Sequence, residues 1–426
     1  MKPIEVKNEL LSEKYFYMKH PSGLNIYVYP KEEYSSTYAI FGTKFGSINN
    51  KFKMISGDIK EVPDGIAHYL EHKLFEGKDT DAFSEYAKTG ASANAFTSFD
   101  KTAYLFSCTD NFEESLKILL NFVQSPYFTE ETVKKEQGII GQEIKMYEDS
   151  PEWNVLFNLL NAMYHNHPVK TDIAGTVESI AKITPELLYD CYENFYSLNN
   201  MSLCIAGNVD SEKIFQIIDQ DLKFRTSKNF KSESIFPEEP REVVKKYVSK
   251  NFEIASPIFN FGFKEDITNI EVNSEYLAYI DVILYSIASK SSRMYEKLLN
   301  EELINTSSFS YEYFHGPNYA SIIFSGESKD PKKVSEIITE EIKSLHKSGL
   351  DKTMFEISKK SLYGQNISIF NSMPSIANIL LDFSFSNRKF FDYITNISKA
   401  NIDNANKIFD KILNPEYTSL SVVNPL

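Results

Sequence analysis

The sequence predicts an α+β protein made of two homologous α/β sandwich domains, each a mixed or antiparallel sheet with helices packed on it. Three observations indicate this fold: a break in composition near the middle of the chain, strand-like and helix-like segments that alternate in both halves, and short motifs that recur in the same order. The break lies at 225–241, where two prolines, three serines and mixed charges occur without a regular period. We therefore expect an N-terminal domain at 1–224 and a C-terminal domain at 242–426, joined by this linker.

The individual segments are assigned from the period of their apolar residues. Alternating or continuous apolar runs predict strands, and apolar residues three and four apart predict helices. In the first half the predicted strands are 24–30, 36–46, 102–108 and 202–207, and the predicted helices are 65–76, 111–123, 130–147 and 184–195. The second half opens with a predicted strand at 257–263 and, after long helical patterns, has another at 319–326.

Two short motifs of the first half recur in the second. GQEI (141–144) corresponds to GQNI (364–367), and MSLCIAG (201–207) corresponds to TSLSVVN (418–424). The offset between partners falls from 223 to 217 residues, as a few loop deletions would produce. We interpret the pattern as an internal duplication.

Charge and cysteine content exclude several classes of protein. The 426 residues include 45 Lys and Arg and 59 Asp and Glu, a net charge of −14 with no basic stripe, so duplex nucleic acid and anionic membranes are poor partners. Cys108, Cys191 and Cys204 lack the spacing of a disulfide framework or a thiolate zinc site. The sequence has no apolar run of about 20 residues and no secretory signal pattern, so we expect a cytoplasmic protein.

The motif that carries chemistry is HxxEH, from His68 to His72. We expect its helix to be capped by Asp64 and to end at Gly77. Residues four apart lie one turn above another, so the two imidazoles can bind one zinc ion with Glu71 beside it. A histidine pair on an exposed helix face can also bind nothing, and a catalytic zinc needs a third protein ligand.

The helix predicted at 130–147 offers a third ligand. Glu136 and Glu143 are seven residues apart and lie on one face. Either they form a solvated acidic edge, or Glu143 is a metal ligand and Glu136 orients a ligand or the substrate. The second-half counterpart of Glu143 is Asn366, and no HxxEH precedes it, so only the first half has a set able to bind metal.

Together these motifs resemble the pitrilysin/insulinase family of zinc metallopeptidases, in which HxxEH is followed by a helix with two glutamates seven apart. The resemblance extends, in family order, through GASANAFTSFDKTAY (90–104), HNHP (165–168) and GTVESIAKITPELL (175–188). It covers most of 20–210 and is looser in the second half. It is greatest to the short two-domain bacterial subunits, and it implies that the two domains form half of a clamshell.

The resemblance also implies roles for particular residues. His68, His72 and Glu143 would hold one Zn²⁺ per chain, and Glu71 would be the general base. Glu136 would support catalysis without binding the metal.

Residues 92–97 resemble a family edge strand that pairs with the substrate backbone. Asn94, Ala95 and Phe96 are then the expected substrate contacts, with affinity that depends little on side-chain identity. A core strand of small residues is the alternative interpretation.

The second half departs from the family pattern. Active members supply an Arg and a Tyr in a stretch resembling SSRLFxxLRExxGLAY, whereas this chain has SSRMYEKLLNEELINTSSFSYEY at 291–313, with Leu299 at the arginine position. The resemblance therefore implies a heterodimer with a related subunit that lacks HxxEH and supplies the Arg-Tyr pair. A homodimer that uses Tyr311 or Tyr313 is the rival.

The sequence thus predicts a zinc-dependent endopeptidase subunit that hydrolyses small unfolded peptides inside a closed chamber. A non-catalytic structural or peptide-binding subunit of the same family, and a metal-binding regulator, are the alternatives. The peptide itself cannot be inferred, because an added strand is recognised through its backbone.

Overall fold

A mixed β-sheet forms the centre of each of two units in the computed structural model, which describes residues 2–223, 232–268 and 270–426. Part of the linker predicted at 225–241 therefore lies outside the described residues. Unit 1 comprises Met1–Ile144, Asp172–Ile235 and Ile367–Phe390, and unit 2 comprises Lys145–Thr171, Phe236–Asn366 and Phe391–Leu426. The predicted α+β class is confirmed.

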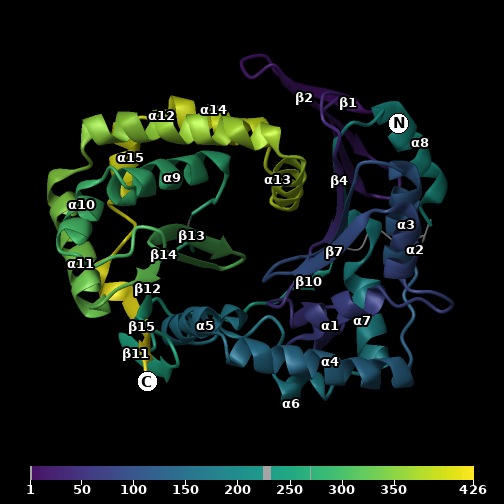
Figure 1. Ribbon diagram of the computed structural model, residues 1–426, viewed down its shortest axis with the longest axis horizontal. Helices are drawn as coiled ribbons and strands as arrows, with labels where there is room; N and C mark the ends of the chain where they lie inside the picture. Colours follow the sequence, from purple (N-terminus) through teal and green to yellow (C-terminus); the bar gives the residue numbers. More distant parts are fainter. Residues whose placement is uncertain (1, 224–231, 269) are drawn as a thin grey trace. The chain divides into compact units, whose positions relative to one another are not determined.

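Unit 1 contains a seven-stranded sheet of order β1-β2-β3-β9-β4-β8-β7 (Figure 1). Its strands are β1 (Ile4–Asn8), β2 (Glu13–Lys19), β3 (Asn25–Pro30), β4 (Thr37–Thr43), β7 (Ser92–Thr97), β8 (Thr102–Cys108) and β9 (Met201–Gly207). Every residue of β4 and β9 is buried, because both faces of the sheet centre are covered. A small sheet of β10 (Glu233–Ser234), β5 (Lys51–Lys53) and β6 (Ile59–Glu61) completes the unit.

The helices of unit 1 include the four predicted in the first half, at 65–76, 111–123, 130–147 and 184–195, together with helices that were not predicted. They are α1 (Ile66–Leu74), α2 (Ala82–Thr89), α3 (Phe112–Val123), α4 (Glu130–Glu148, which extends past the unit boundary), α6 (Val177–Ile180), α7 (Pro185–Phe195), α8 (Ser211–Asp221) and α13 (Met373–Phe385). Helix α1 contacts β7, β8 and α7, so the HxxEH motif lies near one edge of the sheet.

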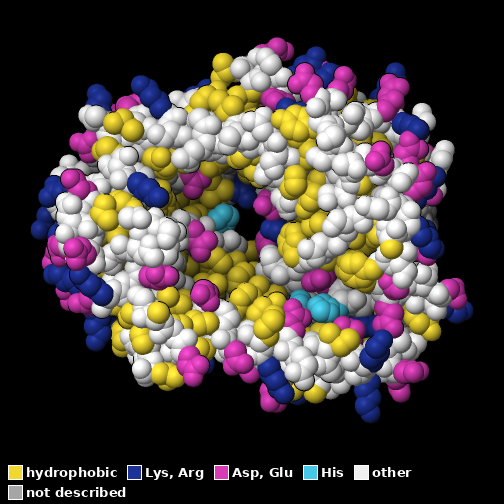
Figure 2. Space-filling model, in the orientation of Figure 1, with side chains coloured by type: hydrophobic (Ala, Val, Ile, Leu, Met, Phe, Trp, Pro, Cys, Tyr) yellow, Lys and Arg dark blue, Asp and Glu magenta, His cyan; other side chains and the backbone are white. Residues whose placement is uncertain are grey.

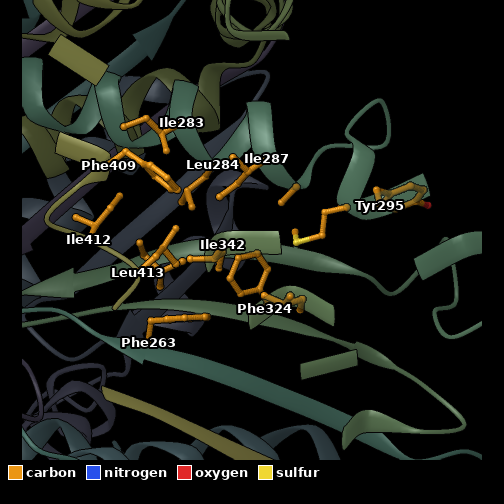
Figure 3. Close-up of a cluster of buried hydrophobic side chains, with 14 of the residues drawn as sticks. Phe263, Ile283, Leu284, Ile287, Tyr295, Phe324, Ile342, Phe409, Ile412 and Leu413 are labelled. Atoms are coloured by element: carbon orange, nitrogen blue, oxygen red, sulfur yellow. The ribbon is translucent and has the colours of Figure 1, made fainter. Parts of the chain in front are cut away.

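Unit 2 contains a five-stranded sheet of order β11-β15-β12-β14-β13. Its strands are β11 (Tyr247–Phe252), β12 (Ile258–Lys264), β13 (Ser310–Gly316), β14 (Tyr319–Glu327) and β15 (Thr418–Pro425). Its helices are α5 (Pro151–Met163), α9 (Ser274–Ala288), α10 (Arg293–Asn300), α11 (Pro331–Ser348), α12 (Lys352–Ser368), α14 (Phe390–Lys399) and α15 (Ile402–Phe409). Figure 3 shows the core, in which Phe263 and Phe324 of the sheet face Ile283 and Ile287 of α9.

The two sheets share one topology, as a duplication requires. The first-unit strands β3, β4, β7, β8 and β9 and the second-unit strands β11 to β15 both follow the spatial order first-fifth-second-fourth-third. In each sheet the first and fifth strands of this set are parallel and the other neighbours antiparallel. The first strands begin 222 residues apart, at Asn25 and Tyr247, and the last 217 apart, at Met201 and Thr418.

Each sheet is covered by one helix from the other half of the sequence. Helix α13 contacts β3, β4 and β9 of unit 1, and α5 contacts β11, β12 and β15 of unit 2. A glycine on each second strand permits the close approach: a Cβ on Gly42 would lie 2.8 Å from Leu381 Cδ2, and one on Gly262 would lie 2.6 Å from Met163 Sδ. The units are thus discontinuous in sequence. Within the described residues, no helix is both long and apolar enough to cross a membrane.

Candidate metal centre

Helix α1 presents the HxxEH motif, but its ends differ from the prediction. The N-cap is Gly65, in the left-handed region with φ of 88°, and it makes no side-chain cap. The predicted Asp64 cap is wrong because the chain turns at Gly65, and Asp64 Oδ1 instead accepts a hydrogen bond from Asn50 Nδ2 at 3.0 Å. The helix ends at Leu74, before the predicted Gly77, whose N–H donates to Thr80 in the following turn.

His68, His72 and Glu143 converge on one point. One ligand atom from each of these three side chains lies within 4.8 Å of the others. Glu143 Oε2 is 3.7 Å from His68 Nε2 and 3.4 Å from His72 Nε2. Figure 2 shows histidine side chains (cyan) beside acidic side chains (magenta) at the surface, over the position of α1 in Figure 1.

Glu136, one of the two predicted glutamates of α4, lies behind this cluster. Its Oε1 is 3.0 Å from His72 Nδ1, the ring nitrogen that does not face Glu143. A carboxylate in this place fixes the ring orientation and keeps Nε2 directed at Glu143.

Glu71 is the buried acid of the centre, with 8% of its surface exposed. Thr97 Oγ1 donates a hydrogen bond to Glu71 Oε2 at 2.9 Å. Burial raises the pKa of the Glu71 carboxyl to about 7, although the nearby His72 and the Thr97 hydroxyl both lower it. A carboxyl with this pKa is suited to exchange protons near neutral pH.

The two histidines have opposite electrostatic environments. Burial, aided by the neighbouring His72, lowers the pKa of His68 to about 4. Burial also acts to lower the pKa of His72, but hydrogen bonds with Glu136 and Glu143 raise it to about 10. At neutral pH His68 is therefore an uncharged donor, and His72 must release a proton when it binds a metal.

The donor set fits a zinc ion. Two imidazole nitrogens and one carboxylate oxygen form a three-residue set of the kind that leaves a fourth position open in catalytic zinc sites. The nitrogens that face Glu143 are Nε2 of His68 and Nε2 of His72. The structure therefore brings together all five residues that the sequence singled out around the motif.

Strand β7 contains the three predicted substrate contacts and, among the residues that the structure describes, is an edge strand that pairs with β8. The turn that closes this hairpin has Ser98 N–H donating to Lys101 O, so alternate residues of β7, Ala95 among them, direct their backbone groups to the free edge. Ala95 N–H donates to Asn94 Oδ1 at 2.9 Å, and the Asn94 side chain is exposed.

Thr97 is the residue of the centre that sequence reasoning gave no role. Thr97 lies 26 positions after Glu71 in the sequence, and it is the last residue of β7, the strand that also contains the predicted substrate contacts. Successive side chains of a strand point to opposite faces of the sheet. If Phe96 faces the substrate, Thr97 faces the other side, and this alternation was the one indication in the sequence that Thr97 could reach the motif.

The chain is similar in sequence to known zinc proteases and to two family descriptions. The family described as "Insulinase (Peptidase family M16)" matches residues 53–177, and "Peptidase M16 inactive domain" matches residues 182–362. The uncharacterized zinc protease YmfH of Bacillus subtilis is 38% identical over all of this chain and 99% of its own length. The uncharacterized zinc protease YmxG of the same organism is 27% identical over 87% of this chain and 91% of its own.

Solved structures give the same result. A putative M16-like peptidase from Alicyclobacillus acidocaldarius superposes with a TM-score of 0.92 at 32% identity, covering 99% of this chain and 100% of that one. Pitrilysin shares the fold alone, with a TM-score of 0.76 at 16% identity over 99% of this chain and 46% of its own.

Two sheets of one topology, with a His-His-Glu cluster on helices α1 and α4 of the first unit, are the features of the two-repeat metallopeptidase class. The comparisons specify the family within that class. The chain belongs to the insulinase family, peptidase family M16, as the sequence motifs predicted.

Proposed function

We propose that the protein is a zinc-dependent endopeptidase subunit that hydrolyses small unfolded peptides. The observation that carries the proposal is the convergence of His68, His72 and Glu143 within 4.8 Å on the helix pair that also presents buried Glu71. A non-catalytic subunit or a metal-binding regulator of this family would not need Glu71 buried and oriented by Thr97.

The chemistry follows from the residues around the cluster. A zinc ion held by His68, His72 and Glu143 would lower the pKa of a water molecule and polarise the carbonyl of the scissile peptide bond. Glu71 takes the proton from the attacking water and later delivers it to the leaving amine. Thr97 holds the Glu71 carboxylate in place, and Glu136 holds the His72 ring.

The substrate binds in this proposal as an added strand along β7. The outward backbone groups of Ala95 pair with the peptide once the Asn94 side chain releases the Ala95 N–H, and Phe96 contacts the peptide on the exposed face. Only an extended peptide can pair with a strand edge, so folded proteins are poor substrates. A closed chamber would restrict peptide size further.

The catalytic unit in this proposal is a heterodimer. Leu299, at the position where family members have an arginine, is 42% exposed on α10 and offers no charged donor. The rings of Tyr311 and Tyr313 pack against the core of unit 2, which disfavours the homodimer that would use them. A related subunit without HxxEH would supply the Arg-Tyr pair.

The three cysteines are free and buried, which suits the reducing cytoplasm.

Zinc analysis with two variants tests the proposal. Glu143→Gln should weaken zinc binding by about 10-fold or more, because a charged ligand is lost. Glu71→Gln should retain zinc and lose about 10² to 10⁴ in peptide cleavage, because only the proton acceptor is lost. Glu131→Gln, which changes an exposed glutamate of α4, is the control. Equal zinc affinity in Glu143→Gln and the wild type, or full activity in Glu71→Gln, would contradict the assignment.

A further inference from the structure

A separate cavity of about 730 Å³ lies in unit 1, away from the metal cluster. Its walls are β2, β3, residues 199–202 and residues 380–390, and it includes no residue of α1, α4 or β7. Its volume is within the roughly 300–1,000 Å³ typical of pockets that hold small molecules.

The charge of this cavity is opposite to that of the chain. Among its described lining residues are four cations, Lys19, Lys44, Arg388 and Lys389, and no Asp or Glu. The protein as a whole carries a net charge of −14. Neither Lys19 nor Lys389 has an ion-pair partner among the described residues. A local group of cations in a concave site attracts and holds an anion.

Tyrosine rings form the floor. Side chains alternate along a strand, so Tyr15, Tyr17 and Lys19 of β2 share one face, and Tyr27 of β3 is the direct register partner of Tyr17. The ring centroids of Tyr17 and Tyr27 are 4.9 Å apart, and those of Tyr15 and Tyr27 are 6.0 Å apart. The planes of Tyr17 and Tyr27 are tilted by 37°, so one exposed face of either ring, rather than both together, is a stacking surface for a planar ring.

The end of α13 places two of the cations. Asn387 has a left-handed φ of 54°, Arg388 N–H donates to Phe383 O at 2.8 Å, and Asn387 N–H donates to Ser384 O at 3.3 Å. This pair of bonds is a Schellman motif, which reverses the chain after a helix. The reversal brings Arg388 and Lys389 to the cavity wall, and the Arg388 guanidinium lies 5.3 Å from the centre of the Phe383 ring.

We propose that this cavity binds a small aromatic anion, of the class of a nucleoside monophosphate. The half-buried rings of Tyr17 and Tyr27 stack on the base, the cations bind the phosphate, and Asn25, Asn199 and Asn387 provide amides for the polar edges of the ring. A peptide strand fits less well, because β2 and β3 are each paired on both sides and offer no free edge. The proposal is independent of the peptidase function.

Isothermal titration of the full chain with adenosine monophosphate, adenosine and inorganic phosphate tests it. We expect adenosine monophosphate to bind at least about 10-fold more tightly than either part alone, since base and phosphate contact different walls. Lys19→Ala and Lys389→Ala should each weaken binding by about 10-fold, as should Tyr17→Leu, whereas Tyr17→Phe keeps the ring and should bind nearly as well. Lys14→Ala is the matched control, because Lys14 lies on the same strand with its side chain on the opposite face.

Three results would overturn the proposal. One is no binding of adenosine monophosphate by the wild type at millimolar concentration. Another is equal affinity for inorganic phosphate, which would leave only a simple anion site. The third is binding of the dipeptide Glu-Tyr without binding of adenosine monophosphate, which would assign the cavity to peptides. The exposed positions of Lys19 and Lys389 allow both variants to fold, and circular dichroism checks this.

Discussion

Glu71 depends on a single hydroxyl for its orientation within a buried site. The Thr97 bond to Oε2 is the one side-chain hydrogen bond made to this carboxylate among the described residues. HxxEH spacing was enough to predict His68, Glu71 and His72, because a helix fixes the geometry of residues three and four apart. Thr97 could not be assigned in this way, since its contact with Glu71 depends on how β7 packs against α1.

Thr97→Val should therefore reduce turnover without removing the metal. Valine has nearly the same shape, so the loss is the hydrogen bond that orients Glu71. We expect kcat to fall by about 10-fold with KM and zinc content unchanged. Thr97→Ser restores a hydroxyl and should recover most of the rate. Loss of zinc in Thr97→Val would instead indicate a structural role.

Glu265, in unit 2, provides a pH-dependent test of stability. Burial raises the pKa of its carboxyl to about 8, and its Oε1 accepts a hydrogen bond from Leu413 N–H at 2.8 Å. Between pH 4.5 and 8 the unfolded chain loses this proton while the folded protein keeps it, so the group makes the protein less stable as the pH rises.

Glu265→Gln keeps an acceptor oxygen and removes this titration. The melting temperature of Glu265→Gln minus that of the wild type should be roughly 2 to 4 °C larger at pH 8 than at pH 5. Glu253→Gln, at an exposed position in the same unit, should show no such change. If the melting temperatures of Glu265→Gln and the wild type differ by the same amount at both pH values, the explanation is contradicted.

At the scale of elements, the buried central strands were predictable, whereas the sheet that each helix covers was not. The apolar runs of β4, β8, β9 and β14 appear in the sequence because both faces of a central strand are buried. An amphipathic pattern shows that a helix has an apolar side, but not which sheet that side covers. For this reason the packing of α5 and α13 on sheets formed by the other half of the chain could not be predicted.

The edge position of β7 leads to a test of substrate binding. Ala95 directs its N–H to the free edge, so Ala95→Pro removes one donor for an added peptide strand while leaving the pairing with β8 intact. We expect KM for peptides to rise by about 5- to 10-fold with zinc content unchanged. Unchanged KM would show that the peptide binds elsewhere.

The contact between Gly42 and α13 can be measured by a double-mutant cycle. Gly42→Ala should destabilise the protein by about 1 to 3 kcal/mol through overlap with Leu381, and Leu381→Ala by about 2 to 5 kcal/mol through a cavity. The double variant should lose less stability than the sum of the two single variants, because the new methyl group at position 42 occupies part of the cavity left by Leu381. Gly138→Ala, in open space on α4, should be neutral or stabilising. Strict additivity in urea unfolding would show that the two sites are not in contact.

At the scale of the whole molecule, the proposed active site lacks one donor, which in our proposal a partner subunit supplies. Negative charge develops on the carbonyl oxygen during hydrolysis, and one positioned donor typically contributes about 10² to 10³ in rate. Such a donor is absent from the position where Leu299 stands. Its absence was visible in the sequence because Leu299 falls within a motif of known order.

Mixing this chain with a related subunit that has the Arg-Tyr pair and lacks HxxEH should raise peptide cleavage by about 10² to 10³. Light scattering should show a one-to-one complex. The same subunit with its Arg changed to Ala should bind equally well without restoring the rate. A chain that is fully active as a homodimer, and unaffected by the partner, would contradict this prediction.

The exchanged helices also impose an order of events on protein synthesis. The ribosome releases β4 about 340 residues before Leu381 of α13 exists to cover it. At about 5 to 20 residues per second, the apolar face of the first sheet stays exposed for roughly 20 to 70 seconds. The nascent first half must wait uncovered for the second, so this protein should be a client of chaperones that bind nascent chains.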